Sequence, residues 1–114
     1  MYKTVFTLNK IFEDNDLLVI DKPSGLETTK RPGSNVSVEI LVTNSDIERN
    51  GIIHRLDKDT SGVLVIAKSN RSYENIKLQF KQHSVRKVYY SLVSGITSRD
   101  ANIKSYIIRD PKRK

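Results

Sequence analysis

The nine positions 54–62 are crowded with polar, charged and small residues, and they lead directly into an uninterrupted apolar run at 63–67. A short apolar run of this kind is typical of a strand that is buried on both faces. Loops that are held by such strands commonly carry the chemistry of a protein. The junction therefore predicts a buried strand with a functional loop in front of it.

Asp57 is the carboxylate that stands out in this loop. It lies between an apolar residue and Lys58, and Arg55 precedes it by two positions, which places both on one face if the segment is extended. A nearby cation favours the ionised, nucleophilic form of a carboxylate. The competing interpretation makes Asp57 and Asp59 solvated turn acids and Arg55 a surface charge. Taken alone, the residues favour that second interpretation.

A β-hairpin is predicted near the N-terminus. Residues 4–7 and 10–12 are expected to be short extended pieces, and the Asp-Asn-Asp sequence at 14–16 is a turn signal. The apolar residues 17–20 follow it and complete the hairpin.

The next segment predicts one short helix and one tight turn. Apolar residues recur at helical spacing over 36–41, and Ser34 or Asn35 can serve as the N-cap. The Asn-Gly dipeptide at 50–51 predicts a tight turn that delivers residues 52–53 as a brief strand before the loop.

A longer helix is expected after the apolar run. Ser69 or Asn70 can cap it, and the helical pattern continues to about Gln82. Its apolar face would be formed by Tyr73, Ile76 and Phe80. These rings are expected in the core of the protein and not on a surface for stacking bases.

The C-terminal part predicts two more strands. Residues 85–95 are rich in β-branched and aromatic side chains, and residues 102–108 follow a polar turn, so the two segments are expected to pair antiparallel. The basic tail at 109–114 is expected to fray. The order of elements indicates an α+β fold with a largely antiparallel, mixed sheet and two helices.

Charge and composition limit the class of protein. Lys and Arg number 20 against 13 Asp and Glu, so the formal net charge is +7 and the pI is near 9.7, which favours a polyanionic partner such as nucleic acid. Cysteine is absent and there are two histidines, so neither a disulfide framework nor a metal site is expected. No stretch approaches the length that spans a bilayer. We therefore expect a soluble, cytoplasmic protein that does not bind membranes.

The run at 54–68 closely resembles the signature of the RluA family of RNA pseudouridine synthases. Residues 11–26 are similar to the family's first motif, which ends in Asn-Lys-Pro, although Asp21 replaces the Asn. Residues 87–95 resemble the family's Lys-x-Tyr strand, and residues 107–111 resemble its Ile-x-Arg-Asp-Pro segment. The resemblance covers nearly the entire chain.

The resemblance implies isomerisation of uridine to pseudouridine in RNA, with Asp57 as the catalytic carboxylate. The base leaves C1′ of its ribose, turns over and reattaches through C5, which requires no cofactor. The resemblance assigns the aromatic ring beside the carboxylate to Tyr89, because the target base must leave its stack. Substrate contacts are expected from Arg55, His54, Thr60, Ser61 and Gly62. The alternatives are a buried, hydrogen-bonded histidine and a structural arginine.

The family's catalytic domain continues beyond the Arg-Asp-Pro segment into further strands and a Gly-Arg-Thr-His-Gln-x-Arg motif. We therefore expect residues 1–114 to be a single domain that is the N-terminal portion of an incomplete, truncated catalytic fold. An incomplete sheet exposes an edge through which the chain can associate with itself. Two alternatives are a non-catalytic basic RNA-binding module and an unrelated carboxylate enzyme, and the length of the motif argues against the second. The sequence does not distinguish ribosomal from transfer RNA.

Overall fold

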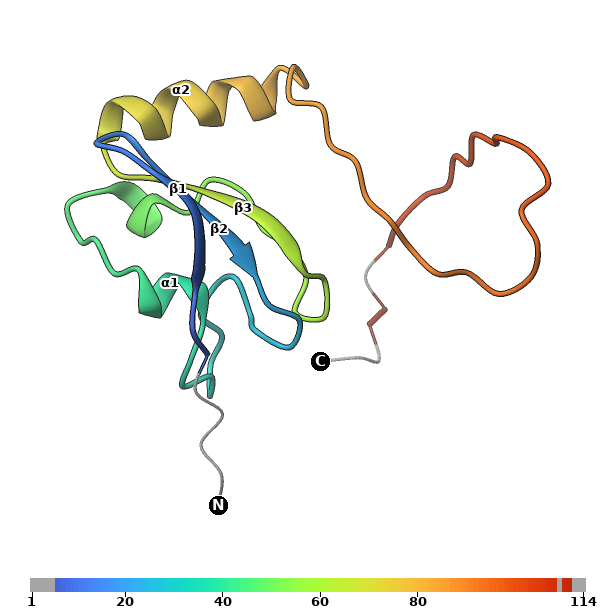
Figure 1. The fold of residues 1–114 in the computed structure, drawn as a ribbon, viewed down its shortest axis with the longest axis horizontal. Helices are drawn as coiled ribbons and strands as arrows, with labels where there is room; N and C mark the ends of the chain where they lie inside the picture. The colour runs from blue at the N-terminus through green and yellow to red at the C-terminus, as the bar shows by residue number, and fades with distance from the viewer. Residues whose placement is uncertain (1–5, 109, 112–114) are drawn as a thin grey trace.

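A three-stranded antiparallel sheet in the order β1-β2-β3 forms the centre of the computed structural model, which describes residues 6–108 and 110–111 (Figure 1). The elements are β1 (Asn9–Glu13), β2 (Leu17–Lys22), α1 (Val38–Leu41), the 3-10 helix η1 (Glu48–Gly51), β3 (Gly62–Ala67) and α2 (Asn70–Lys81). The predicted α+β class, with an antiparallel sheet and two helices, is confirmed. Residues 4, 5, 109 and 112–114, which belong to segments predicted above, lie outside the described residues.

The predicted hairpin is present as β1 and β2. Lys10 pairs with Ile20 and Glu13 with Leu18, with an irregularity between Lys10 and Phe12. The Asp14 carboxylate closes the turn, because its Oδ1 accepts hydrogen bonds from the backbone N–H groups of residues 16 and 17 at 2.8 and 2.7 Å. This is the side-chain turn chemistry that the Asp-Asn-Asp sequence predicted.

β3 divides the core into two clusters. Leu64 and Ile66 pack against β2 and α1 in the larger cluster, whereas Ala67 packs with Tyr73 of α2 in the smaller one. Successive side chains of a strand point to opposite faces, so one strand supports both clusters. The prediction that the strand is buried on both faces is wrong at its start, because the side chain of Val63 is 59% exposed.

The first helix starts later than predicted. It begins at Val38, and its N-cap is Ser37, whose hydroxyl accepts a hydrogen bond from the N–H of Ile40 at 3.3 Å. Ser34 instead ends a turn, since its N–H donates to the carbonyl of Arg31. The predicted cap residues are therefore wrong, because the preceding turn already uses Ser34.

The tight turn at 50–51 is confirmed. Arg49 and Asn50 have positive φ angles of 51° and 53°, and Gly51 has a φ of 79°. A Cβ on Gly51 would lie 2.1 Å from the carbonyl oxygen of Ala67, so glycine is required by space as well as by conformation. The predicted brief strand reduces to one bridge between Ile52 and Ile66.

The longer helix forms as predicted. Ser69 is the N-cap, and its side chain exchanges hydrogen bonds with Ser72 in a capping box. Tyr73 is buried in the core as predicted, whereas Ile76 and Phe80 are half-buried and line a cleft described below, so the expected core position of the Phe80 ring is wrong. None of the helices in the described part of the chain is long and apolar enough to cross a membrane.

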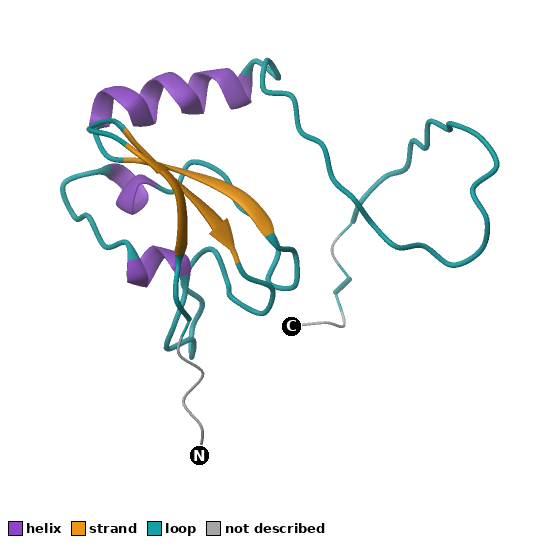
Figure 2. Cartoon of the chain, in the orientation of Figure 1, coloured by secondary structure: helices purple, strands orange, loops and turns teal. Residues whose placement is uncertain are grey.

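The two predicted C-terminal strands are wrong. Residues 85–95 and 102–108 contain no strand, and Figure 2 shows the chain after α2 as a long loop. Strand propensity reflects packing on a half-buried surface, and an isolated hairpin is only marginally stable in water. Part of the outer edge of β3 is already occupied, by the Ile52 bridge and by the ring of His54. The segment's apolar side chains therefore stay exposed.

Candidate functional site

The residues between the Ile52 bridge and β3, 54–61, form a turn that we call the motif loop. The N–H of Thr60 donates to the carbonyl of Asp57 at 3.1 Å, which reverses the chain between them. Residues 22–28, which are the last residue of β2 and the chain that follows it, lie against the loop and form most of the hydrogen bonds that hold it; we call them the support segment. The hydrogen bonds between the two segments join residues that lie 28 to 36 positions apart in the sequence.

Lys22 is the buried centre of the support segment. Its side chain is fully buried, and Nζ donates to the carbonyls of Pro23 at 2.9 Å, Leu26 at 2.6 Å and Lys58 at 3.0 Å. An ammonium group has three donors, so all three are used. Burial lowers the pKa of Lys22, while the charges of Asp59 and Asp57 act in the opposite direction.

Further hydrogen bonds fix the backbone on both sides of Asp57. Thr28 Oγ1 donates to the carbonyl of Leu56 at 2.7 Å and accepts from its N–H at 3.2 Å. The N–H of Gly25 donates to the carbonyl of residue 58 at 2.8 Å, and Ser24 Oγ donates to that of Asp59 at 2.9 Å. The backbone at 56, 58 and 59 is thus anchored, and the side chain of Asp57 is left free to project outward.

Asp57 and Arg55 form an exposed ion pair. Arg55 Nη2 lies 3.8 Å from Asp57 Oδ1, and the two side chains are 54% and 86% exposed. The nearby cation that the sequence predicted for Asp57 is therefore present. Solvent screens a pair of this kind, so it contributes little to stability.

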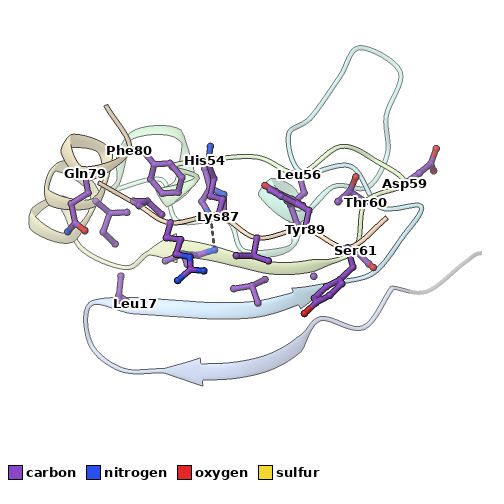
Figure 3. Close-up of a pocket in the computed structure, with 18 residues that line it drawn as sticks. Leu17, His54, Leu56, Asp59, Thr60, Ser61, Gln79, Phe80, Lys87 and Tyr89 are labelled. Carbon is purple, nitrogen blue, oxygen red and sulfur yellow. Dashed lines mark hydrogen bonds between the residues drawn. The ribbon is translucent and has the colours of Figure 1, made fainter. Parts of the chain in front are cut away.

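A cleft of about 1240 Å³ lies beside the motif loop, between β3, the end of α2 and the chain that follows α2 (Figure 3). The motif loop and the start of β3 contribute Asp59, Thr60, Ser61, Gly62 and Val63. The end of α2 and the chain that follows it contribute Phe80, Lys87 and Tyr89. The structure therefore brings the predicted residues Thr60, Ser61, Gly62 and Tyr89 to one cavity.

Asp57 is not among the residues that line this cleft. We expected its carboxylate to face the same cavity as Tyr89, and this geometric prediction is wrong, because the side chain is 86% exposed to solvent. The turn at 57–60 directs residues 59–62 toward the cleft and Asp57 away from it. The position of Tyr89, in turn, is not set by strand pairing, because its segment pairs with no strand in the described chain.

His54 is half-buried and hydrogen-bonded within the fold. Its Nε2 accepts from the N–H of Val65 at 3.0 Å, and its ring stacks on Phe80 with 4.7 Å between centroids and 20° between planes. Burial lowers the pKa of His54, and the charge of Lys87 lowers it further. The contacts agree with the alternative interpretation of a buried, hydrogen-bonded histidine.

Sequence reasoning did not single out Lys22 or Thr28. A signal for Lys22 was present in the alternation of β2, because Leu18, Ile20 and Lys22 share one face of the strand and Ile20 lies in the core. A lysine at an inward position before a loop predicts a role in binding backbone carbonyls. Thr28 carries no comparable signal, because its contacts depend on how the two loops meet.

Residues 16–114 match the family RNA pseudouridylate synthase. This match covers most of the chain, and the chain therefore belongs to that family of RNA-modifying enzymes. The predicted resemblance to the RluA family is confirmed by relatives of the same type.

The chain is 40% identical over 114 residues to an uncharacterized RNA pseudouridine synthase from Aquifex aeolicus. This match covers 91% of the chain and 36% of the Aquifex protein. The chain is 39% identical over 115 residues to ribosomal large subunit pseudouridine synthase D of Buchnera aphidicola, covering 94% and 36%. The solved structure of human RNA pseudouridylate synthase domain containing 4 has the same fold over 67% of this chain and 30% of that chain, with a TM-score of 0.52 and 22% identity. The chain thus spans about a third of the length of these relatives.

Proposed function

We propose that residues 1–114 are the N-terminal portion of the catalytic domain of an RNA pseudouridine synthase, and that Asp57 is its catalytic carboxylate. The observation that carries the proposal is the anchored motif loop, in which the backbone on both sides of Asp57 is hydrogen-bonded while its carboxylate is 86% exposed. A group that must attack a substrate has to be accessible and held in place. Family membership supplies the reaction.

The reaction breaks the bond between N1 of uracil and C1′ of ribose and forms a bond between C5 and C1′. The proton on C5 is lost, and N1 gains one, so the product is an isomer of the substrate. Asp57 would form a covalent intermediate through C1′ or the uracil ring, or assist cleavage of the glycosidic bond. All three routes use one carboxylate and no cofactor.

A cleft for a flipped base is the second part of the proposal. The target uridine must leave its stack, and an aromatic ring compensates for part of the lost stacking. Tyr89 lines the cleft together with Thr60, Ser61 and Gly62, so these residues would contact the base or its ribose. Arg55, beside Asp57 on the exposed side of the loop, would bind a phosphate of the RNA.

We infer that this chain alone is not a complete site. It spans 36% of the two curated relatives described above, and the cleft that contains Tyr89 does not include Asp57. The remaining part of the catalytic domain would cover the cleft, supply a further cation and bring the flipped base to Asp57. A displacement on the order of 1 Å can reduce a rate about a hundredfold, so this incomplete geometry predicts little activity.

The alternative is a basic RNA-binding module without catalysis. The net charge of +7 favours it, and so does the absence of Asp57 from the cleft that Tyr89 lines. It predicts RNA affinity that falls steeply with salt, because Lys and Arg contacts release counterions from the phosphates, and it predicts no isomerisation in any version of the chain.

Release of tritium from C5 of labelled uridine in RNA tests the proposal. The proteins are this chain, a version extended through the family's arginine-containing motif, and Asp57→Asn in each, with Asp46→Asn as a matched control on an exposed, distant carboxylate. Ribosomal RNA is the first substrate, because the Buchnera relative is named for the large ribosomal subunit, and transfer RNA is the second. Release by the extended version that depends on Asp57 and not on Asp46 supports the proposal. No release from either length supports the binding module.

A further inference from the structure

We propose that His54 is a positioning residue that fastens the start of the motif loop to β3, acting as the neutral imidazole with its proton on Nδ1. Its meaning for catalysis rests on the proposed function of Asp57, three residues further along the loop. The fastening itself can be tested without RNA. It replaces the expected role of His54 as a direct substrate contact.

The imidazole completes the outer edge of β3. Ile52 bridges to Ile66 on the side of β3 that faces away from β2, and one residue earlier the N–H of Val65 donates to His54 Nε2 at 3.0 Å. A side-chain nitrogen thus occupies the place of a carbonyl from a neighbouring strand. The strand pairing ends at this point and the motif loop begins, so His54 sets where the loop leaves the sheet.

The ring also joins the loop to α2. His54 stacks on Phe80, in the last turn of the helix, with 4.7 Å between ring centroids. This contact and the Val65 hydrogen bond fix the imidazole from two directions. Because Lys22 anchors residue 58 on the other side of Asp57, Asp57 lies between two independent anchors.

The hydrogen bond requires one protonation state. Nε2 can accept from Val65 only when it carries no proton, which leaves the proton of the neutral ring on Nδ1. A protonated imidazole would direct a second N–H at the N–H of Val65, and the loop would lose this anchor. Burial and Lys87 both lower the pKa of His54, which favours the accepting form at neutral pH.

The groups around the ring are otherwise mostly neutral. α2 contributes Phe80 and the uncharged Gln79 to the cleft, and β3 contributes Val63 and Val65. The charged residues that line the same cleft are Asp59 on the motif loop and Arg86 and Lys87 after α2. Of these three charged residues, Lys87 is the one whose charge shifts the pKa of His54, and it lowers that pKa.

Nuclear magnetic resonance of the ¹⁵N-labelled chain tests the inference. Long-range ¹H–¹⁵N spectra report which imidazole nitrogen is protonated, and the amide of Val65 reports the hydrogen bond. We expect His54 to hold its proton on Nδ1 and to titrate below the ordinary histidine range. We expect the Val65 amide to be protected at pH 7.5 and to lose about tenfold in protection as His54 becomes protonated.

Two substitutions separate the hydrogen bond from packing. His54→Gln keeps an acceptor that does not titrate, so protection of Val65 should persist and become independent of pH. His54→Phe keeps a ring to stack on Phe80 but has no acceptor, so protection should fall at every pH. His83→Asn is the control, because His83 is the other histidine, is exposed and has a positive φ of 55° that Asn tolerates.

The wild-type spectra decide the matter even if a variant fails to fold. A proton on Nε2, or titration of His54 without any response at Val65, would overturn the inference whether or not the protein acts on RNA. In an active extended version, the acid limb of the rate profile should shift in His54→Gln and stay in place in His83→Asn. An unshifted limb with the expected spectra would show that the anchor does not position Asp57.

Discussion

The buried ammonium of Lys22 donates a hydrogen bond to the backbone carbonyl of Lys58 at 3.0 Å, across 36 positions of sequence. The same ammonium binds the carbonyls of Pro23 and Leu26, so one side chain ties the end of β2 to the residue that follows Asp57. The loop that carries the proposed catalytic group is therefore held in place by the last residue of β2, which is distant from the loop in the sequence.

Lys22→Met tests this relationship. Methionine has a similar length but no donor, so three carbonyls would lose their partner in a buried place. We expect the free energy of unfolding to fall by about 2 to 4 kcal/mol, measured by urea denaturation. Lys10→Met is the matched control, because the side chain of Lys10 is 61% exposed and its ion pair with Glu13 is screened by water. An equal loss in both variants would contradict the anchoring role of Lys22.

Gly51→Ala should be among the most damaging single substitutions. Its Cβ would lie 2.1 Å from the carbonyl oxygen of Ala67, and the residue has a φ of 79°, so steric conflict adds to conformational strain. We expect a loss of more than about 3 kcal/mol in stability. Gly33→Ala carries similar strain, at a φ of 82°, with no atom within 4 Å, and should cost about 1 to 2 kcal/mol. Thermal unfolding of both variants would measure the difference.

Stability should decline as the pH falls below about 6.5, the ordinary pKa of histidine in the unfolded chain. Burial lowers the folded pKa of His54, so its contribution is present above that pH and is lost as the pH falls toward the folded pKa. The expected loss of stability is about 1 kcal/mol, which is the typical contribution of a hydrogen bond such as the one to Val65. Urea denaturation between pH 7.5 and 5.5 would measure this slope, which His54→Gln should remove. A slope that is unchanged in His54→Gln and absent in His83→Asn would show that His83, and not His54, causes the pH dependence.

Asp57→Asn should leave the fold intact. The side chain is 86% exposed and makes one long ion pair with Arg55, so the free energy of unfolding should change by less than about 0.5 kcal/mol. Circular dichroism and urea denaturation would measure whether the variant is folded. If it is, a loss of activity in an extended version reflects the missing carboxylate and not unfolding. A large loss of stability would show that the carboxylate has a structural role, and activity data on this variant would then need a different substitution.

The features that the sequence predicted well depend on neighbours in the chain. The Asp14 turn, the Ser69 capping box and the turn at Gly51 are each defined by a few adjacent residues. The outward direction of Asp57 and the contacts of Lys22 depend on how two distant loops meet, and no local pattern encodes that meeting. His54 was ambiguous for the same reason, since its acceptor role requires Val65 to lie beside it.

The two predicted C-terminal strands do not form, for a related reason. Residues 85–95 and 102–108 have strong local strand propensity, yet propensity forms a strand only where an edge is available for pairing and a face for packing. In the described chain these residues pair with no strand edge and most of their apolar side chains are exposed, so the local propensity does not produce a strand.

These exposed apolar residues predict self-association of the chain. Leu92, Ile96 and Tyr106 are almost completely exposed, and long apolar segments of high strand propensity tend to pair with other chains. We expect the apparent mass in sedimentation velocity to rise with protein concentration. Leu92→Lys combined with Tyr106→Lys should suppress the increase, because charges on unpaired strand-forming segments oppose pairing.

The control for that experiment is Thr97→Lys combined with Ser98→Lys, which adds the same charge to the polar turn between the two apolar segments. Suppression by the apolar substitutions alone would assign the association to strand-forming side chains. Equal suppression by both pairs would assign it to net charge, because like charges keep chains apart whatever their position. An extended version that covers these side chains should remain monomeric at concentrations where the 114-residue chain associates, since the covering part of the domain would remove the surface on which association depends.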